Sequence, residues 1–291
     1  MPTLPHNSKV KIVECPRDAM QGILDFIPTS QKISYINTLL KVGFHTLDCG
    51  SFVSPKMIPQ MRDTEQVLES IDLTDTSTLL SVIVANNRGA ADAVKHDQIK
   101  YLGFPFSISE TFQKRNTNKT ILESFDTVKY ILDACGSNNK QMVVYISMGF
   151  GNPYGDDWNS AIVTDWIGKL VDLGVNQFSL SDTVGVSDEE SIEAVFGNLK
   201  THFKSLDVGA HFHTTQEAWR TKIDSAYKYG CRKFDGAIRG FGGCPMAKDE
   251  LVGNMPTECL LEFFGNENLE IDLNEFQKSV LLADQLFTAY L

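Results

Sequence analysis

The 291-residue sequence predicts an α/β protein, a closed (β/α)8 TIM barrel with a C-terminal helical extension. Short apolar or β-branched runs alternate with longer amphipathic runs about eight times along the chain. Eight strand-and-helix units in a chain of this length fit a closed parallel barrel better than an open doubly wound sheet. No glycine-rich dinucleotide fingerprint follows the first apolar run, which further disfavours a Rossmann domain.

The short apolar runs are the expected strands. They cover residues 9–15, 44–50, 79–85, 99–106, 141–148, 176–182, 207–213 and 231–238. The amphipathic runs between them predict helices at residues 31–42, 57–70, 88–95, 119–134, 159–173, 188–203, 215–229 and 256–264. Several of these helices have start signals, such as the Ser187-Asp188-Glu189-Glu190 sequence before an apolar-periodic run.

The whole chain, residues 1–291, is expected to form one domain. The barrel takes up about residues 9–264, and a helical tail follows over about residues 272–291. The tail is amphipathic, so we expect it to pack outside the barrel or to contact a second subunit in a homodimer.

Composition excludes several classes of function. The formal net charge of −11 argues against a nucleic-acid-binding or anionic-membrane-binding surface, although a few basic residues in one cleft could still bind an anionic substrate. The N-terminal segment lacks the features of a secretory signal, and no apolar run approaches the ~18 to 20 residues that span a bilayer. The six cysteines show no CxxC pairing, which fits reduced thiols. A cytoplasmic protein is therefore expected.

The HFH sequence at residues 211–213 is a candidate metal site. On a strand, side chains at positions i and i+2 share a face and lie roughly 6.6 Å apart. His211 and His213 could therefore bind a divalent ion if a third ligand came from elsewhere. The alternative is a pair of hydrogen-bonded core histidines, and the motif alone does not separate the two hypotheses.

Other polar residues fall at or after the C-terminal ends of predicted strands, where such barrels carry their active sites. These residues are Arg17, Asp18, Gln21, Asp48, Ser51, Asp182, Thr183, Cys244 and Asn254. Together with the two histidines they supply carboxylate, imidazole and amide ligands. Mg²⁺ or Mn²⁺ is the expected ion, with Zn²⁺ as the alternative.

Four of these residues also have a purely structural interpretation. Asp18 could be a helix N-cap, Asp48 and Asp182 could anchor strand-end turns or loops, and Cys244 could be a small buried hydrophobe. The structural interpretation is harder to hold for all of them together, because so many polar groups on one rim need partners.

Several motifs give the sequence a family resemblance. They are VECPRDAMQ (13–21), DCGSFVSPKMIPQM (48–61), SETFQKRNTN (109–118), SLSDTVG (179–185), HFHTT (211–215) and GFGGCPMA with the following Gly253-Asn254. In this order, over roughly residues 9–264, the chain resembles 3-hydroxy-3-methylglutaryl-CoA lyases, metal-dependent TIM-barrel carbon–carbon lyases. The SFVSPK…PQM block and the GGCP loop are the most specific parts, since a generic metal-dependent barrel needs neither.

The resemblance implies roles for most of the candidate residues. Asp18, His211, His213 and Asn254 would bind the metal, and Arg17 and Gln21 would contact the acyl substrate. Ser51 and Thr183 would be further substrate contacts. Asp48 stands where the family has a glutamate, and Cys244 would lie on a glycine-rich loop that closes over the substrate.

Besides Asp48, the sequence departs from the family pattern at four places, one of which is Gly22-Ile23, where an acidic residue is usual nearby. The first motif lacks one residue before Pro16, and Ala19 replaces a glycine. Thr214 replaces an acidic residue beside the metal histidines. None of these changes removes a proposed ligand, but changes around metal ligands can alter affinity or activity by one to two orders of magnitude. Altered acyl specificity or a weakened enzyme therefore remains open.

The implied activity is an oxo-acid-lyase that cleaves hydroxymethylglutaryl-CoA, or a close homologue, into acetyl-CoA and acetoacetate. A divalent ion would lower the pKa of the substrate hydroxyl, and His213 or Asp18 would take its proton. Arg17 would stabilise the enolate, with Asp48 orienting Arg17 or shuttling a proton. Cys244 would protonate the enolate carbon.

An acyl-CoA substrate also needs cations for its phosphates. Lys56, Lys114, Arg115 and Lys119 are candidates, and the alternative for each is a solvated surface charge. Two other functions remain open: another acyl-CoA or keto-acid lyase, synthase or aldolase on the same barrel, and a non-catalytic barrel.

Overall fold

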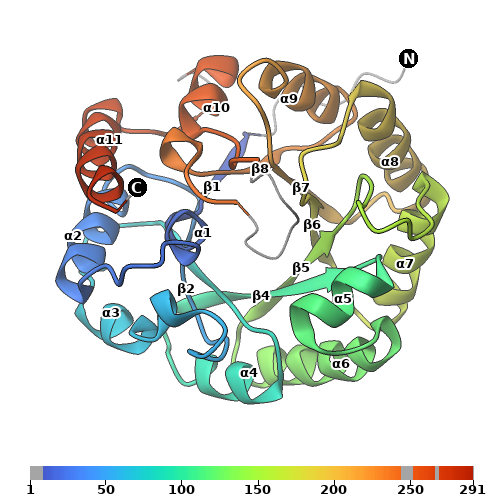
Figure 1. The fold of residues 1–291 in the computed structure, drawn as a ribbon, viewed down its shortest axis with the longest axis horizontal. Helices are drawn as coiled ribbons and strands as arrows, with labels where there is room; N and C mark the ends of the chain where they lie inside the picture. The colour runs from blue at the N-terminus through green and yellow to red at the C-terminus, as the bar shows by residue number, and fades with distance from the viewer. Residues whose placement is uncertain (1–8, 244–251, 266–268, 291) are drawn as a thin grey trace.

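Eight parallel strands form a closed barrel surrounded by helices (Figure 1). The computed structural model describes residues 9–243, 252–265 and 269–290. Each strand pairs with the next along the chain, and the eighth pairs with the first. The strands are β1 (Lys11–Glu14), β2 (Thr46–Ser51), β3 (Leu79–Ile83), β4 (Ile99–Ser107), β5 (Gln141–Ser147), β6 (Gln177–Asp182), β7 (Asp207–Phe212) and β8 (Lys233–Gly236). The predicted TIM barrel is confirmed, and each predicted strand overlaps an observed one.

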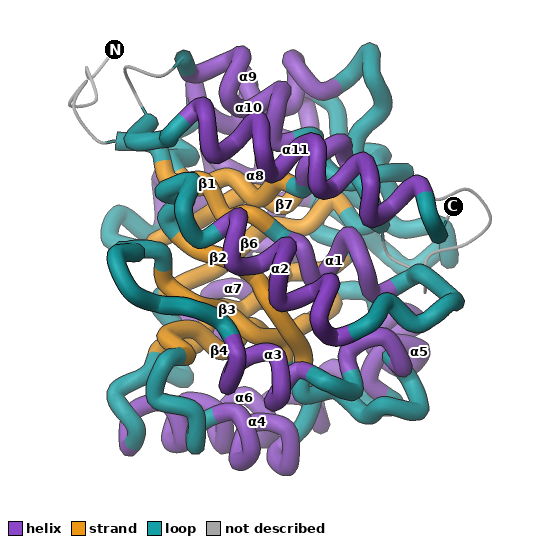
Figure 2. Tube along the Cα trace, turned by 90° about the vertical axis from the view of Figure 1, so that its left-hand side faces the viewer, coloured by secondary structure: helices purple, strands orange, loops and turns teal. Residues whose placement is uncertain are grey.

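The helices surround the strands on the outside of the barrel (Figure 2). They are α1 (Pro16–Gln21), α2 (Thr29–Leu39), α3 (Thr64–Ser70), α4 (Asn87–Ala93), α5 (Glu110–Thr117), α6 (Ile121–Ser137), α7 (Ser160–Asp172), α8 (Glu189–His202), α9 (Trp219–Lys228), α10 (Thr257–Phe264) and α11 (Leu273–Thr288). Two short 3-10 helices, η1 (Pro59–Met61) and η2 (Ile238–Gly240), follow β2 and β8.

Helices α1 and α5 were not predicted from the sequence. They contain only six and eight residues, too few for a helical apolar period to stand out. The helix predicted at 57–70 begins too early, because residues 59–61 form a separate 3-10 turn before α3. The helix predicted at 215–229 likewise begins only at Trp219.

The predicted C-terminal helix is present as α11. It begins after Asp272, whose side chain accepts hydrogen bonds from the N–H groups of the first turn. Its apolar face packs on the outside of the barrel: Phe287 lies edge-on to Tyr35 of α2, with ring centroids 5.8 Å apart, and Phe276 contacts Phe44 in the same way at 6.4 Å. No helix in residues 9–243, 252–265 and 269–290 is long and apolar enough to cross a membrane.

The main core lies between the barrel and the helix layer. Phe106 of β4 is fully buried and packs against Phe125 of α6 and Trp166 of α7, at centroid distances of 5.6 and 6.0 Å. Contacts of this kind hold each helix on its strand pair, and they leave the C-terminal ends of the strands to carry polar side chains.

Glu14, the last residue of β1, is a fully buried acid outside the cavity. Its Oε1 accepts a hydrogen bond from the Ile238 N–H at 2.9 Å, and its Oε2 accepts one from the Thr257 hydroxyl at 2.5 Å. These bonds connect β1 to the segment after β8 and to α10. Burial raises the pKa of Glu14 to about 8, because the two hydrogen bonds only partly offset the loss of solvation.

The raised pKa predicts a specific effect of pH on stability. Above its ordinary pKa of 4.5 Glu14 ionises in the unfolded chain, whereas in the folded protein it stays protonated up to about pH 8. Glu14 therefore lowers the free energy of unfolding as pH rises from about 4.5 to 8, by about 5 kcal/mol in total. We expect Glu14→Gln, which keeps one acceptor and supplies a donor, to be increasingly more stable than wild type over this range.

Urea unfolding at several pH values between 5 and 8 would measure the difference. Glu69→Gln, at an exposed position on α3, is the matched control and should follow the wild-type curve. Parallel curves for wild type and Glu14→Gln would show that Glu14 is already ionised in the folded protein.

Candidate metal centre and substrate cavity

A cavity opens at the C-terminal end of the barrel and holds about 940 Å³ of empty space, counting its open mouth. Its polar lining comprises Arg17, Asp18, Gln21, Ser51, Asn116, Tyr145, Ser147, Ser181, Thr183, His211 and His213. Its apolar lining comprises Val53, Met57, Ile58, Ile83, Ala85, Pro105 and Phe112. This is the end of the barrel at which TIM-barrel enzymes place their active sites.

Helix α1 brings three polar side chains to the cavity directly after β1. Pro16 occupies its first turn, where a residue without an N–H group and with a fixed φ favours the start of a helix. Arg17 and Asp18 follow at once, and Gln21 lies one turn later. The N-cap is Cys15 and Asp18 lies inside the first turn, so the interpretation of Asp18 as an N-cap is wrong.

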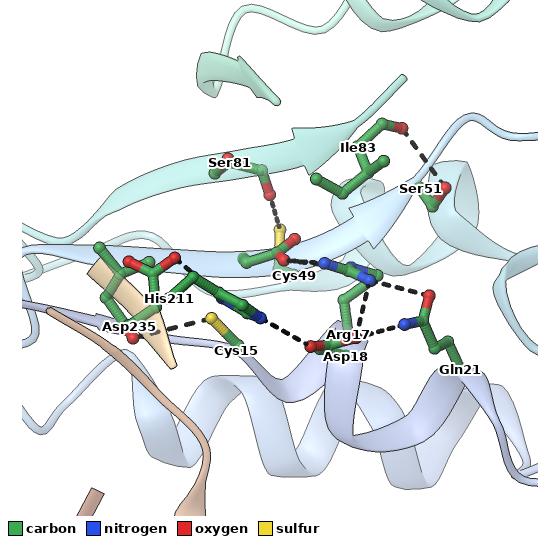
Figure 3. A network of polar contacts seen from close by, with 12 residues as sticks. Cys15, Arg17, Asp18, Gln21, Cys49, Ser51, Ser81, Ile83, His211 and Asp235 are labelled. Atoms are coloured by element: carbon green, nitrogen blue, oxygen red, sulfur yellow. Dashed lines mark hydrogen bonds and ion pairs between the residues drawn. The ribbon is translucent and has the colours of Figure 1, made fainter. Parts of the chain in front are cut away.

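Arg17 is held from two sides by acidic groups. Its Nε and Nη2 donate to Oδ2 of Asp48 at 3.0 and 2.6 Å. Its Nη1 donates to Oδ1 of Asp18 at 3.1 Å and to Oε1 of Gln21 at 2.8 Å (Figure 3). The guanidinium is therefore fixed in one orientation at the wall of the cavity.

Asp48 is fully buried, and its second oxygen, Oδ1, has no hydrogen-bond partner among the described residues. Burial raises the pKa of Asp48 above its ordinary value, although the Arg17 charge counteracts this. For Asp18 burial acts in the same direction, but the Arg17 charge and the His211 hydrogen bond hold the pKa of that carboxyl well below its ordinary range. Asp18 is thus ionised and able to bind a cation.

His211 and His213 point to one face of β7 and its extension, with ring centroids 5.4 Å apart. Figure 3 shows His211 between two carboxylates. Its Nδ1 lies 3.0 Å from Oδ2 of Asp235 and its Nε2 lies 3.5 Å from Oδ2 of Asp18. Burial opposes a charge on His211, but these hydrogen bonds outweigh burial and raise its pKa to about 10.

The donor groups fit a divalent ion. One ligand atom each of Asp18, His211 and His213 lies within 4.8 Å of the other two. Burial and the neighbouring His211 lower the pKa of His213 to about 4, so at pH 7 its imidazole is neutral and offers a lone pair. The two carboxylates that flank His211 strongly favour a positive charge there. The same two carboxylates would favour a bound metal ion. One carboxylate and two imidazoles suit Mg²⁺, Mn²⁺ or Zn²⁺.

A second group of possible ligands, Cys15, His211 and Asp235, meets the same distance criterion. It lies on the Nδ1 side of His211, whereas Asp18 lies on the Nε2 side. The hydrogen bond to Asp235 fixes the His211 ring and leaves Nε2 for a ligand in the cavity, an arrangement common behind metal-bound histidines.

Asn254 lies beside His213. The two residues form an isolated antiparallel bridge, and the Met255 N–H donates to the Phe212 carbonyl at 3.0 Å. Asn254 is buried, and its Nδ2 donates to the Phe241 carbonyl at 2.8 Å. This bond orients the side chain and leaves its amide oxygen as the group that can bind a cation.

Ser51 and Thr183, which were predicted to contact the substrate, both line the cavity. The Ser51 hydroxyl donates to the Ile83 carbonyl at 3.3 Å, and Thr183 Oγ1 accepts a bond from the Met148 N–H at 2.9 Å. Asp182 is different, because it does not line the cavity and instead binds the loop that follows it. For Asp182 the loop-anchoring interpretation is therefore the correct one.

The loop after β8 approaches α1 very closely. A Cβ atom at Gly242 would lie 2.5 Å from the Asp18 carbonyl oxygen, and the φ of Gly242 is +89°, so only glycine fits there. The predicted Cys244 follows two residues later and lies outside the described residues.

The four predicted phosphate-binding cations do not line the cavity. Lys114 pairs with Glu110 of the same helix at 3.0 Å, and Lys119 donates to Thr127. Arg115 lies over the ring of Tyr154, at 4.7 Å from its centroid, and Lys56 is exposed.

Sequence reasoning missed Asp235, Tyr145 and Lys222. Asp235 had a detectable signal, since it is an acid inside a predicted strand, and register places it directly opposite His211. Tyr145 lines the cavity and lies edge-on to His211, at a centroid distance of 5.9 Å. Lys222 gave no signal, because a lysine in an amphipathic helix is normally solvated.

Comparisons with known proteins agree with this geometry. The HMGL-like family model matches residues 9–277. The chain is 32% identical over 281 residues to the hydroxymethylglutaryl-CoA lyase YngG of Bacillus subtilis, covering 96% of this chain and 92% of that protein. It is 33% identical over 264 residues to the human mitochondrial hydroxymethylglutaryl-CoA lyase, covering 90% of this chain and 79% of that protein.

Solved structures are similar over nearly the whole chain. The HMG-CoA lyase of Bacillus subtilis superposes with a TM-score of 0.89 at 29% identity, covering 97% of this chain and 95% of that chain. An HMG-CoA lyase from Acinetobacter baumannii, in complex with coenzyme A and 3-methylmalate, superposes with a TM-score of 0.88 at 28% identity, covering 98% and 93%.

The ligand geometry predicts that His213→Ala weakens binding of Mn²⁺ by more than about 100-fold, since removing a ligand costs more than removing a group that only supports one. Titration calorimetry or the electron paramagnetic resonance signal of free Mn²⁺ would measure the dissociation constant. His45→Ala, at the opposite end of the barrel where β2 begins, is the matched control and should bind Mn²⁺ like wild type. Equal affinity for His213→Ala and wild type would mean that the two histidines are core residues.

Proposed function

The chain belongs to the HMGL-like family, and we propose that it cleaves 3-hydroxy-3-methylglutaryl-CoA into acetyl-CoA and acetoacetate with a bound divalent metal ion. The observation that carries this proposal is the convergence of Asp18, His211 and His213 beside the fixed guanidinium of Arg17 in one cavity. These groups meet the needs of a carbon–carbon lyase: a site for a Lewis acid, a base, and a cation for the departing enolate.

An acyl-CoA is the proposed substrate class. The Acinetobacter baumannii HMG-CoA lyase was solved with coenzyme A and 3-methylmalate, which supports acyl-CoA recognition in this family. In this chain the polar end of the cavity would take the hydroxyl and carboxylate of the acyl group. Its apolar wall, with Val53, Ile58 and Phe112, would take the methyl group and the thioester arm.

Asp18, His211, His213 and Asn254 would hold the metal. Mg²⁺ or Mn²⁺ is proposed, with Zn²⁺ as the alternative. When bound, the ion supplies a Lewis acid that lowers the pKa of the substrate hydroxyl and orients it.

The side chains of this protein supply the remaining chemistry. His213 or Asp18 takes the hydroxyl proton, and Gln21, Ser51 and Thr183 contact the substrate. Arg17 stabilises the negative charge of the enolate, because its N–H donors lie at the cavity wall. Its guanidinium group also keeps its positive charge near neutral pH.

Two further residues complete the proposed mechanism. Asp48 orients Arg17, a role supported by the two hydrogen bonds between them. Cys244 donates the proton that converts the enolate into the acetyl group.

We also propose a homodimer in the cytoplasm. Leu273 and Leu281 are apolar and exposed on α11, which supports a subunit contact there. In the described parts of the chain the five cysteines are free thiols, which is typical of a reducing compartment.

The direct test is a coupled assay for acetyl-CoA and acetoacetate from hydroxymethylglutaryl-CoA, with Mg²⁺ or Mn²⁺ and then with excess chelator. We expect both products in the presence of metal and none after chelation, with His213→Ala inactive and His45→Ala active. If wild type binds metal but forms neither product, the substrate must be a different acyl-CoA or keto acid. Turnover that persists in chelator would contradict the metal-dependent mechanism.

Arg17→Lys tests the role of the guanidinium. Lysine keeps the charge but cannot bind Asp48 and Asp18 with a planar fork, so kcat should fall by about 10²- to 10³-fold. The Mn²⁺ dissociation constant should change far less than kcat. A loss of metal affinity that matches the loss of kcat would instead assign Arg17 to holding Asp18 in place.

A further inference from the structure

Lys222 lies on the outer helix α9, yet only 2% of its surface is exposed. Its ammonium group reaches the C-terminal ends of β6 and β7. There it donates to Oδ2 of Asp182 at 2.6 Å, to the Gly185 carbonyl at 3.0 Å and to the His213 carbonyl at 2.8 Å. An ammonium has three N–H donors, so all of them are used. A lysine buried and satisfied to this degree is uncommon.

Asp182 connects this lysine to a cavity loop. Its Oδ1 accepts a bond from the Val186 N–H at 2.9 Å. Its Oδ2 accepts bonds from the N–H and the hydroxyl of Ser187 at 3.1 and 2.6 Å. The carboxylate therefore closes residues 183–187 into one loop, and that loop begins with the cavity residue Thr183.

The hydrogen bond from Lys222 to the His213 carbonyl lies just beyond the end of the pairing between β6 and β7. The β6–β7 ladder ends at the pair Asp182 and Phe212, one residue before His213. On the other side, the segment at Asn254 still pairs with His213. Toward β6 the His213 carbonyl has lost its strand neighbour, and the Lys222 ammonium takes that place.

We propose that Lys222, paired with Asp182, is a positioning residue that fixes the backbone of His213 and so directs its imidazole toward Asp18 and His211. The same ammonium links this ligand to the loop that carries Thr183. A substrate contact and a metal ligand are thus held by one buried ion pair that touches neither the substrate nor the metal. The inference rests on the proposed metal centre and extends it to a residue of the outer helix layer.

The test compares Lys222→Met with Lys140→Met. Methionine approximates the length of lysine without its charge or donors. Lys140 is also buried and also donates to backbone carbonyls, of His96 at 2.7 Å and of Ile99 at 2.9 Å, but it lies at the opposite end of the barrel, just before β5. Both variants should lower the melting temperature. Only Lys222→Met should raise the Mn²⁺ dissociation constant, by about 10- to 100-fold, as expected for a group that supports a metal ligand.

The double variant Asp182→Asn with Lys222→Met covers the case in which the single variant does not fold. It removes both charges, so no unpaired charge is left buried, and it should fold with the same weakened Mn²⁺ binding. An Mn²⁺ affinity equal to that of wild type in either folded variant would overturn the inference, as would an equal loss in Lys140→Met. Wild type that binds Mn²⁺ without cleaving hydroxymethylglutaryl-CoA would refute the proposed function and leave this inference standing.

Discussion

The pairing of β1 with β8 is the constraint on which the candidate site depends. These strands lie more than 200 residues apart in the chain, and their register places Val13 opposite Asp235 and Glu14 opposite Gly236. Closure therefore brings α1, which follows β1, next to the acids and histidines of β7 and β8. Without it Asp18 would not approach His211, and Gly242 could not contact the backbone of α1.

Charge balance explains why this site favours a bound cation. Asp18 lines the cavity, Asp48 and Asp235 contact the lining residues Arg17 and His211, and all three carboxylates are buried. Arg17 neutralises part of this negative charge by binding Asp48 and Asp18. The negative charge that Arg17 does not neutralise acts on His211, which lies between Asp18 and Asp235 and is favoured in its protonated form. A divalent ion bound beside His211 would balance this negative charge without a proton on the imidazole.

Polar side chains also connect the barrel to its outer layer, and they do so at both sides of the site. Glu14 reaches outward to Thr257 of α10, and Lys222 reaches inward from α9 to Asp182. Each connection places a polar group where a wrong geometry would leave it unpaired in a low dielectric. Such groups disfavour other arrangements of the loops around the cavity, because another arrangement would leave them without partners.

Local sequence determined the eight strands, most of the long helices and the same-face placement of His211 and His213, because these features follow from side-chain periodicity within one segment. The positions just after predicted strands indicated most of the polar lining of the cavity, including Arg17 and Asp18, and the motif resemblance added the lyase activity and the roles of these residues. The partner of each polar group was decided only by the tertiary structure. Asp182 and Asp235 both lie in strands, yet the first anchors a loop and the second supports a histidine. Lys222 is buried, although a lysine in an amphipathic helix is normally solvated. Strand order and register bring distant segments together, and no local pattern records which acid will face which base.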